Sequence, residues 1–198
     1  MGKNKFKQLS QWIVRCYSTR FMLVLLFAYV GFFWLFNFSA LPLSNPELVK
    51  LSGREGLLDA MPYYSAQEAS TALIHYGTAG RELYLRFLAA DFVFIFIYSL
   101  GFALLLTRAV RCLGVENNSW FLLNLLPLFI GFFDCVENLL ILTMLILYPG
   151  TSAALGTISG AATLCKNFLM LLTLFSLASV GMVLLMRRLG FKSRRITL

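Results

Sequence analysis

The chain is poor in the side chains that build most metal sites and disulfide frameworks. It has one histidine, His75, and four cysteines, and no two cysteines form a Cys-x-x-Cys pair. A zinc site needs about four ligands of these types at close spacing, and a thiol redox site needs paired thiols. The sequence therefore predicts neither site and indicates no cofactor. We interpret the cysteines as small buried residues and His75 as a surface residue.

Charge is also scarce. Only 13% of the residues are charged and 59% are hydrophobic, and the mean hydropathy is +0.77. Four stretches are long enough to cross a ~30 Å hydrocarbon core, at residues 21–41, 87–107, 120–148 and 160–186. Because the later connections are short, consecutive helices should be antiparallel neighbours. The sequence predicts an all-α membrane protein: a four-helix up-down transmembrane bundle in one domain over residues 1–198.

The basic residues are distributed unevenly about these stretches. Twelve of the seventeen lie on one side: Lys3, Lys5, Lys7, Arg15, Arg20, Arg108, Arg111, Arg187, Arg188, Lys192, Arg194 and Arg195. Loops rich in lysine and arginine stay in the cytoplasm, so we expect both termini there and the protein in the bacterial inner membrane. Topology and contact with anionic lipid account for the net charge of +8. We therefore expect membrane lipid, and no nucleic acid, as a partner.

Residues 42–86 form the one sizeable segment outside the predicted spans, on the predicted outer face. Ser44-Asn45-Pro46-Glu47 is typical of a helix start with proline in the first turn, and Ser65-Ala66-Gln67-Glu68 matches a capping box. The apolar residues between these motifs predict short amphipathic helices that lie on the membrane or cap the bundle. We expect Gly77-Thr78-Ala79-Gly80-Arg81 to break the helix before the second span.

Polar residues interrupt the third predicted span at Asp134, Glu137 and Asn138. They are three and four positions apart and so share one helix face. An ionisable group at that depth costs about 2.5 kcal/mol or more on insertion scales, so these residues must face protein, a partner or water. Pro127 lies on nearly the same side, where we expect a kink. The neighbouring spans carry further polar residues on single faces: Asp91, Tyr98, Thr163, Lys166 and Asn167.

The depth of these residues predicts where a pocket opens. Counted from the outer end of each span, Glu137 lies ~16 Å deep, Asp91 ~6 Å and the Lys166 backbone ~9 Å. Because a lysine side chain extends several ångströms beyond its backbone, we expect Lys166 to approach Glu137 from the outer side. The predicted polar pocket opens to the outer half of the membrane.

Charges within the predicted spans do not balance. Three carboxyls face one cation there, and Arg86, with Arg81 close by at the boundary, can serve only Asp91. One acid is left without a counter-charge in a buried place. We therefore expect Asp134 or Glu137 to be protonated near neutral pH.

The segments GRELYLRFLAADFVFIFIY, FFDCVENLLILTMLILYPG and ATLCKNF combine into one pattern. It consists of Gly-Arg before the second span, Asp within it, Asp-x-x-Glu-Asn with Tyr-Pro at the exit of the third, and Thr-x-x-Lys in the fourth. Over about residues 65–170 the chain thus resembles a group of small bacterial four-span membrane proteins. The resemblance implies a four-helix membrane fold and no particular substrate. It also implies that six residues belong together: Asp91, Asp134, Glu137, Asn138, Thr163 and Lys166.

These residues leave several functions open. Our leading hypothesis is a buried polar site that binds or modifies a lipid-like or amphiphilic molecule. In an enzyme, Asp134 or Glu137 would be the acid or base, Lys166 an electrostatic partner, and Tyr98 and Asn138 orienting donors. Alternatives are a proton-linked carrier or channel acting as an oligomer, such as a homodimer, an accessory subunit bound to a membrane partner protein, and a purely structural polar network.

Overall fold

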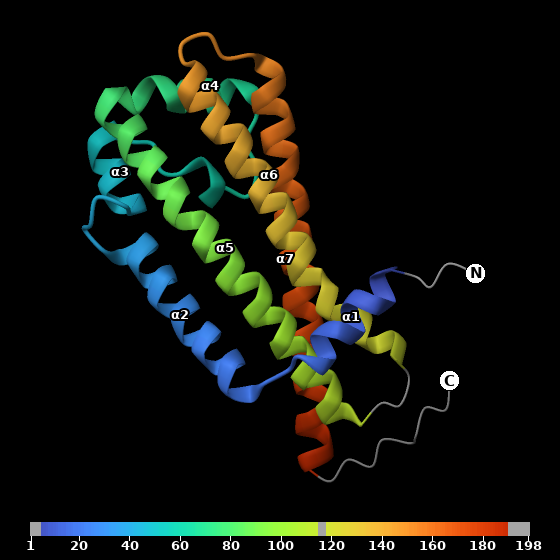
Figure 1. Cartoon of the computed structure of the whole chain (residues 1–198). Helices are drawn as coiled ribbons and strands as arrows, with labels where there is room; N and C mark the ends of the chain where they lie inside the picture. Colours follow the sequence, from blue (N-terminus) through green and yellow to red (C-terminus); the bar gives the residue numbers. More distant parts are fainter. Residues whose placement is uncertain (1–4, 115–117, 190–198) are drawn as a thin grey trace.

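The computed structural model describes residues 5–114 and 118–189, and every regular element in these ranges is a helix (Figure 1). Lys3, Lys192, Arg194 and Arg195, which contributed to the predicted topology, lie outside the described residues. The α-helices are α1 (Lys5–Arg15), α2 (Thr19–Phe38), α3 (Asn45–Ser52), α4 (Ala66–His75), α5 (Gly77–Leu113), α6 (Leu126–Leu147) and α7 (Ala153–Arg188). Two 3₁₀ helices, η1 (Leu58–Ala60) and η2 (Asn118–Leu125), complete the chain order.

Four of these segments are long and apolar enough to cross a membrane: Thr19–Phe38, Gly77–Leu113, Ser119–Leu147 and Ala153–Arg188. The predicted all-α membrane bundle is confirmed, and the protein is a multi-pass membrane protein. Two spans are much longer than predicted, because α5 begins ten residues before the apolar stretch and α7 begins seven residues before it. Since the sequences at these helix starts contain no proline, hydrogen-bonded helix continues beyond the predicted apolar stretches.

The predicted helix break over residues 77–81 is wrong in its extent. Only Gly77 leaves the helical conformation, with φ +58, and α5 continues through Gly80 and Arg81. A Cβ atom on Gly80 would lie 3.0 Å from the Tyr76 side chain and 3.4 Å from Leu48, so this glycine permits close packing of α5 against α3. Pro127 does not kink a helix either, since it lies in the first turn of α6, where no intrahelical donor is lost.

Helix packing leaves α2 at one edge of the bundle (Figure 1). The closest pairs are α6 with α7 and α5 with α6, while α2 packs on α5 and α3. The α2–α5 contact is largely aromatic: Tyr29 stacks on Phe94 with ring centroids 5.5 Å apart, and Phe36 meets Phe87 at 4.7 Å. Pairs of this kind stabilise by about 0.5–1.5 kcal/mol beyond the buried area. Aromatic contacts, together with an aliphatic cluster of Met22 and Leu25 on Ala103 and Leu104, hold α2 in place.

Residues 39–76, which include α3, η1 and α4, cover one end of the bundle, and we call this the capped end (Figure 1). The expected helix starts are present: Ser44 accepts from the Glu47 amide, and Ser65 and Glu68 form both bonds of a capping box. Close approach to α7 depends on a glycine, because a Cβ atom on Gly156 would lie 2.8 Å from the Ala66 Cα. The capped end is thus packed into the bundle and is not a separate domain.

At the opposite end, α1 packs against η2. The Ser10 hydroxyl donates to the Phe121 carbonyl at 2.8 Å, and the Asn124 amide donates to the Ser10 carbonyl at 3.3 Å. The outward face of α1 exposes Trp12, beside basic residues such as Lys7, which is the composition of a helix at a membrane surface. The sequence analysis did not predict α1, because an 11-residue helix ahead of a span carries no apolar run.

The cysteines are not the buried residues that we expected. Cys16, Cys112 and Cys165 are exposed and Cys135 is half-buried. Cys165 precedes Lys166 in α7 and lies on the outward face of that helix, because Lys166 takes the inward position. In a membrane-spanning helix, a small apolar side chain can contact lipid as favourably as it contacts the bundle interior. His75 is exposed, as expected, with its Nδ1 3.2 Å from Glu55 Oε1.

Candidate functional site

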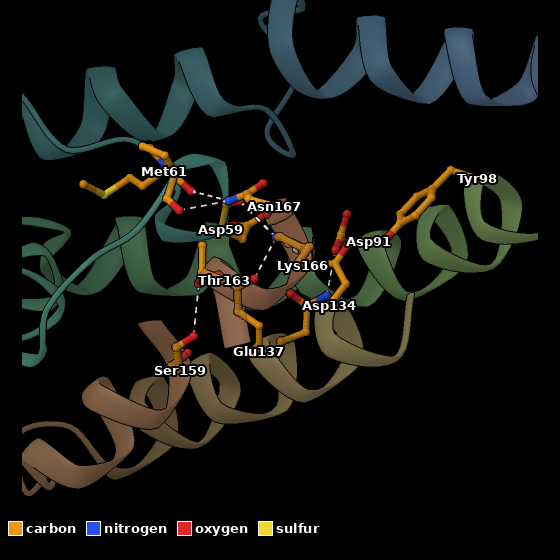
Figure 2. A network of polar contacts seen from close by, with 12 residues as sticks. Asp59, Met61, Asp91, Tyr98, Asp134, Glu137, Ser159, Thr163, Lys166 and Asn167 are labelled. Carbon is orange, nitrogen blue, oxygen red and sulfur yellow. Dashed lines mark hydrogen bonds and ion pairs between the residues drawn. The ribbon is translucent and has the colours of Figure 1, made fainter. Parts of the chain in front are cut away.

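Lys166 lies at the centre of a buried polar cluster (Figure 2). Its side chain is 7% exposed, and its ammonium nitrogen is 2.9 Å from Asp134 Oδ1 and 2.7 Å from Glu137 Oε2. It also donates to the backbone carbonyl of Asp59 at 3.1 Å. One lysine of α7 thus joins two carboxyls of α6 to the segment that covers the capped end. A buried ion pair is stable only when its remaining polar atoms are also satisfied.

Hydroxyl groups complete the surroundings of both α6 acids. Tyr98 of α5 donates to Asp134 Oδ2 at 2.6 Å. Glu137 is fully buried, and its Oε1 lies within hydrogen-bond distance of the Thr163 hydroxyl and 3.3 Å from the Tyr64 hydroxyl. Ser159 in turn contacts Tyr64 at 2.6 Å. The carboxyl oxygens of the two acids are therefore held by residues of two helices, α5 and α7, and by Tyr64 of the capped end.

Asp91 belongs to the same cluster through α6. Its Oδ2 accepts from the Asn138 amide at 2.7 Å, and both residues are buried. The prediction that Arg86 pairs with Asp91 is wrong. Arg86 is exposed on the surface of α5, where its guanidinium nitrogen lies 3.8 Å from Glu82 Oε2. Arg81 is also outside the site, since it donates to the Leu73 carbonyl and its guanidinium covers the Tyr148 ring at 4.1 Å.

The depth predicted for Asp91 and Lys166 was too shallow, because α5 and α7 begin earlier than the apolar stretches. Measured along each helix from the capped end, at 1.5 Å per residue, Asp91 lies ~21 Å from the start of α5 and Lys166 ~20 Å from the start of α7. Asp134 lies ~20 Å from the end of α6 by the same measure. These residues of three helices therefore meet at one level.

Asp59 is the main site residue that the sequence analysis missed. It lies in η1, its Oδ1 accepts from the Tyr84 hydroxyl at 2.6 Å, and its backbone binds Lys166. The next residues follow α7: the Asn167 amide donates to the carbonyls of Met61 and Pro62 at 3.3 and 3.1 Å (Figure 2). Residues 59–64 therefore form a strap that closes the cluster at the capped end. An acid within the apolar run Leu57 to Pro62 was the available signal.

The environment of Asp59 favours its neutral form. Burial raises the pKa of Asp59 above its ordinary range, and the nearby Asp134 raises this pKa further, while Lys166 and the bond from Tyr84 partly offset the rise. A carboxyl whose pKa is raised in the folded state binds a proton more tightly there than in the unfolded state. Ionisation of Asp59 therefore costs folding free energy.

This shift gives a test with a definite sign. Replacing Asp59 by asparagine keeps an oxygen that accepts from Tyr84 but removes the ionisation. The stability that the neutral Asp59 contributes should be fully present below the unfolded pKa of about 3.9. It should be lost as the pH rises toward the raised folded pKa. The melting temperature of wild type should therefore fall more over this range than that of Asp59→Asn. Thermal melting in neutral detergent from pH 4 to pH 8 measures both, with the exposed Glu82→Gln as the control. A difference between wild type and Asp59→Asn that is constant with pH would contradict a raised pKa.

A cavity of about 280 Å³ opens beside the cluster. Six lining residues belong to the polar cluster, and we call this group the polar end: Asp59, Asp91, Tyr98, Asp134, Lys166 and Asn167. The other lining residues are mainly aromatic and aliphatic, such as Phe33, Phe36, Phe94, Phe102, Met170 and Leu174. Residues of both α2 and α7 line the cavity. Each of these helices packs mainly on other helices, α2 on α5 and α3, and α7 on α6, α4 and α5. The cavity therefore lies between α2 and α7.

The cluster has the components of general acid–base chemistry. Asp134 lines the cavity, while Glu137 lies behind it and does not, so Asp134 is the acid that a bound molecule can touch. Lys166 couples the two acids because it contacts both. In the described ranges no group of three or more His, Cys, Asp and Glu side chains has the arrangement of a metal site. The carboxyls of the cluster are groups that can exchange protons.

No family model matches the chain, and neither the search of curated proteins nor the search of solved structures gave a match.

Proposed function

We propose that the protein binds a lipid-like, amphiphilic molecule in the cavity between α2 and α7. The observation that carries this proposal is the mixed lining, which combines a group of carboxyls and one lysine with many phenylalanines. A molecule with a polar head and an apolar chain matches both parts. Ligand sites are commonly mainly apolar, with a few polar groups that fix orientation. A purely structural network would not need a cavity beside it.

Entry from the membrane is consistent with the position of the cavity. Its walls include exposed side chains, such as Phe33 of α2 and Leu174 of α7. Both are 43% exposed or more in a face that meets lipid in a membrane-spanning bundle. We infer that an amphiphile enters sideways between α2 and α7, with its head toward the capped end.

If the bound molecule is also modified, Asp134 is the residue that exchanges a proton with it. Glu137 and Lys166 then act as positioning and charge-balancing residues, and Tyr98 and Asn138 orient the carboxyls that they bind. We place the protein in the bacterial inner membrane with the capped end outside, because the described basic residues Arg108, Arg111, Arg187 and Arg188 lie at the opposite end.

Photo-crosslinking tests the binding site. A neutral alkyl glycoside with a diazirine on its chain, added to the protein in phosphatidylcholine nanodiscs, should label residues of the cavity wall such as Phe36 and Phe94 in addition to the outer surface. Ala60 is exposed and lines the cavity, so Ala60→Phe should reduce cavity labelling severalfold by filling the space.

The matched control is Ala178→Phe, the same substitution at an exposed position of α7 outside the cavity. It should leave cavity labelling unchanged. Labelling confined to outward residues such as Phe27 and Phe175, and equal in the wild type and Ala60→Phe, would overturn the proposed binding site.

A further inference from the structure

The charged donor of the cavity is fully engaged within the protein. A lysine ammonium has three N–H donors and no acceptor. Lys166 donates to Asp134 and to the Asp59 carbonyl, at 2.9 and 3.1 Å, and forms an ion pair with Glu137 at 2.7 Å. No other lysine, arginine or histidine of the described residues lines the cavity. A phosphate or carboxylate head would therefore meet no available cation.

The neutral donors at the polar end are also used. Tyr98 donates its hydroxyl hydrogen to Asp134, and Asn167 donates its amide hydrogens to the carbonyls of Met61 and Pro62. The Asn138 amide donates to Asp91, and the Tyr84 hydroxyl donates to Asp59. The side-chain donors named here therefore already bind acceptors of the protein itself.

Acceptors, in contrast, remain. Asp91 is 4% exposed, and only its Oδ2 has a hydrogen-bond partner in the described part of the chain. Asp59 likewise uses Oδ1 alone. Neither acid has a cation of the described chain within ion-pair distance. Both residues line the cavity, and each has one carboxyl oxygen without a hydrogen-bond donor in the described part of the chain.

A second observation indicates that the cavity is built to be filled. Thr173 lines it and is 3% exposed, yet its hydroxyl has no hydrogen-bond partner. Threonines in helices commonly bond the carbonyl four residues earlier, as Thr107 does with Ala103. A buried hydroxyl left without a partner is unfavourable, so Thr173 is a candidate contact for a bound molecule in the apolar part.

From these observations we propose that the amphiphile carries a primary ammonium head, which donates N–H groups to Asp91 and Asp59 while its chain lies along the phenylalanines. This inference rests on the proposed function and names the class of ligand for the same site. An ammonium supplies N–H donors to the two acids, and its positive charge favours their ionised form, so that Asp59 gives up its proton when the ammonium binds. The head can belong to a simple alkylamine or to an aminophospholipid, which share this chemistry.

Competition against the photoreactive glycoside tests the head group at neutral pH in phosphatidylcholine nanodiscs. Dodecylammonium should displace the probe from the cavity at concentrations roughly tenfold or more below those that dodecyltrimethylammonium needs. The second compound has the same charge and chain but no N–H donor. A tenfold difference in affinity is the size expected for one hydrogen bond between charged groups. Dodecanoate should compete least. Lysophosphatidylethanolamine, compared with lysophosphatidylcholine, distinguishes an aminophospholipid from a simple amine.

Variants assign the preference to residues. Asp91→Asn and Asp59→Asn, tested separately, should each reduce the preference for dodecylammonium severalfold without abolishing probe labelling. The control is Glu82→Gln, which changes an exposed acid of α5, the helix that carries Asp91. This control should leave the preference unchanged. Two variants are used so that a folding defect in one does not decide the result. Equal displacement by the quaternary amine or by dodecanoate would overturn the ammonium assignment while cavity labelling persists. Loss of cavity labelling in the wild type would instead overturn the proposed function itself.

Discussion

Lys166→Met is expected to lower the free energy of unfolding by about 3–5 kcal/mol, the usual cost of removing one partner of a buried ion pair. The loss is large because one substitution leaves two buried carboxyls, Asp134 and Glu137, without their shared cation. It also removes the bond from Lys166 to the strap carbonyl of Asp59. Titration with dodecyl sulfate, followed by circular dichroism, measures the change.

Two further variants isolate the charge effect. Lys50→Met breaks the pair with Glu47, which is 3.3 Å long with the lysine side chain 75% exposed, and should cost no more than about 1 kcal/mol. The triple variant Lys166→Met, Asp134→Asn, Glu137→Gln should recover much of the lost stability, because amide carbonyls still accept from Tyr98 and Thr163. A Lys166→Met protein as stable as wild type would show that the cluster carries no ion pair.

Gly160→Ala is expected to be the most damaging glycine-to-alanine change among the described residues. A Cβ atom at this position would overlap the backbone carbonyl oxygen of Tyr64, and a backbone atom cannot move aside as a flexible side chain can. The strap must therefore lift away from α7, which breaks the contact between Tyr64 and Ser159. Overpacking typically costs about 1–3 kcal/mol, and we expect the upper end of that range together with reduced cavity labelling.

The same helix provides the control. A Cβ atom on Gly181 would meet nothing within 4 Å, and alanine is the better helix former by about 0.5–1 kcal/mol. Gly181→Ala should therefore be as stable as wild type or slightly more stable in the same titration. If Gly160→Ala matches Gly181→Ala, the strap does not pack on α7 as described.

Several features of the fold followed from local sequence signals. Apolar stretches of about 20 residues predicted the spans, and the motifs at Ser44 and Ser65 predicted helix starts that the structure contains. Helix periodicity placed the polar residues of each later span on one face, and the structure brings these faces together. This worked because burial of a charged group in a membrane is so costly that such residues must face inward.

The remaining features depend on tertiary contacts that no local pattern encodes. The lengths of α5 and α7 exceed their apolar windows, so the depth of Asp91 was underestimated and Arg86 was assigned to it wrongly. Asp59 looked like one more acid of an exposed segment, since its burial requires the strap to cross α7. That crossing in turn depends on Gly156 and Gly160, whose role is visible only when the opposing backbone is known.

The most direct test of the central claim is a crystal structure of the protein grown in a lipidic mesophase that contains an alkylamine. The expected result has the Lys166 ammonium within ion-pair distance of both Asp134 and Glu137, and elongated density between α2 and α7 with its head against Asp91 and Asp59. A structure in which Lys166 points away from the α6 acids, or in which side chains of α2 and α7 fill the space between them, would contradict the claim.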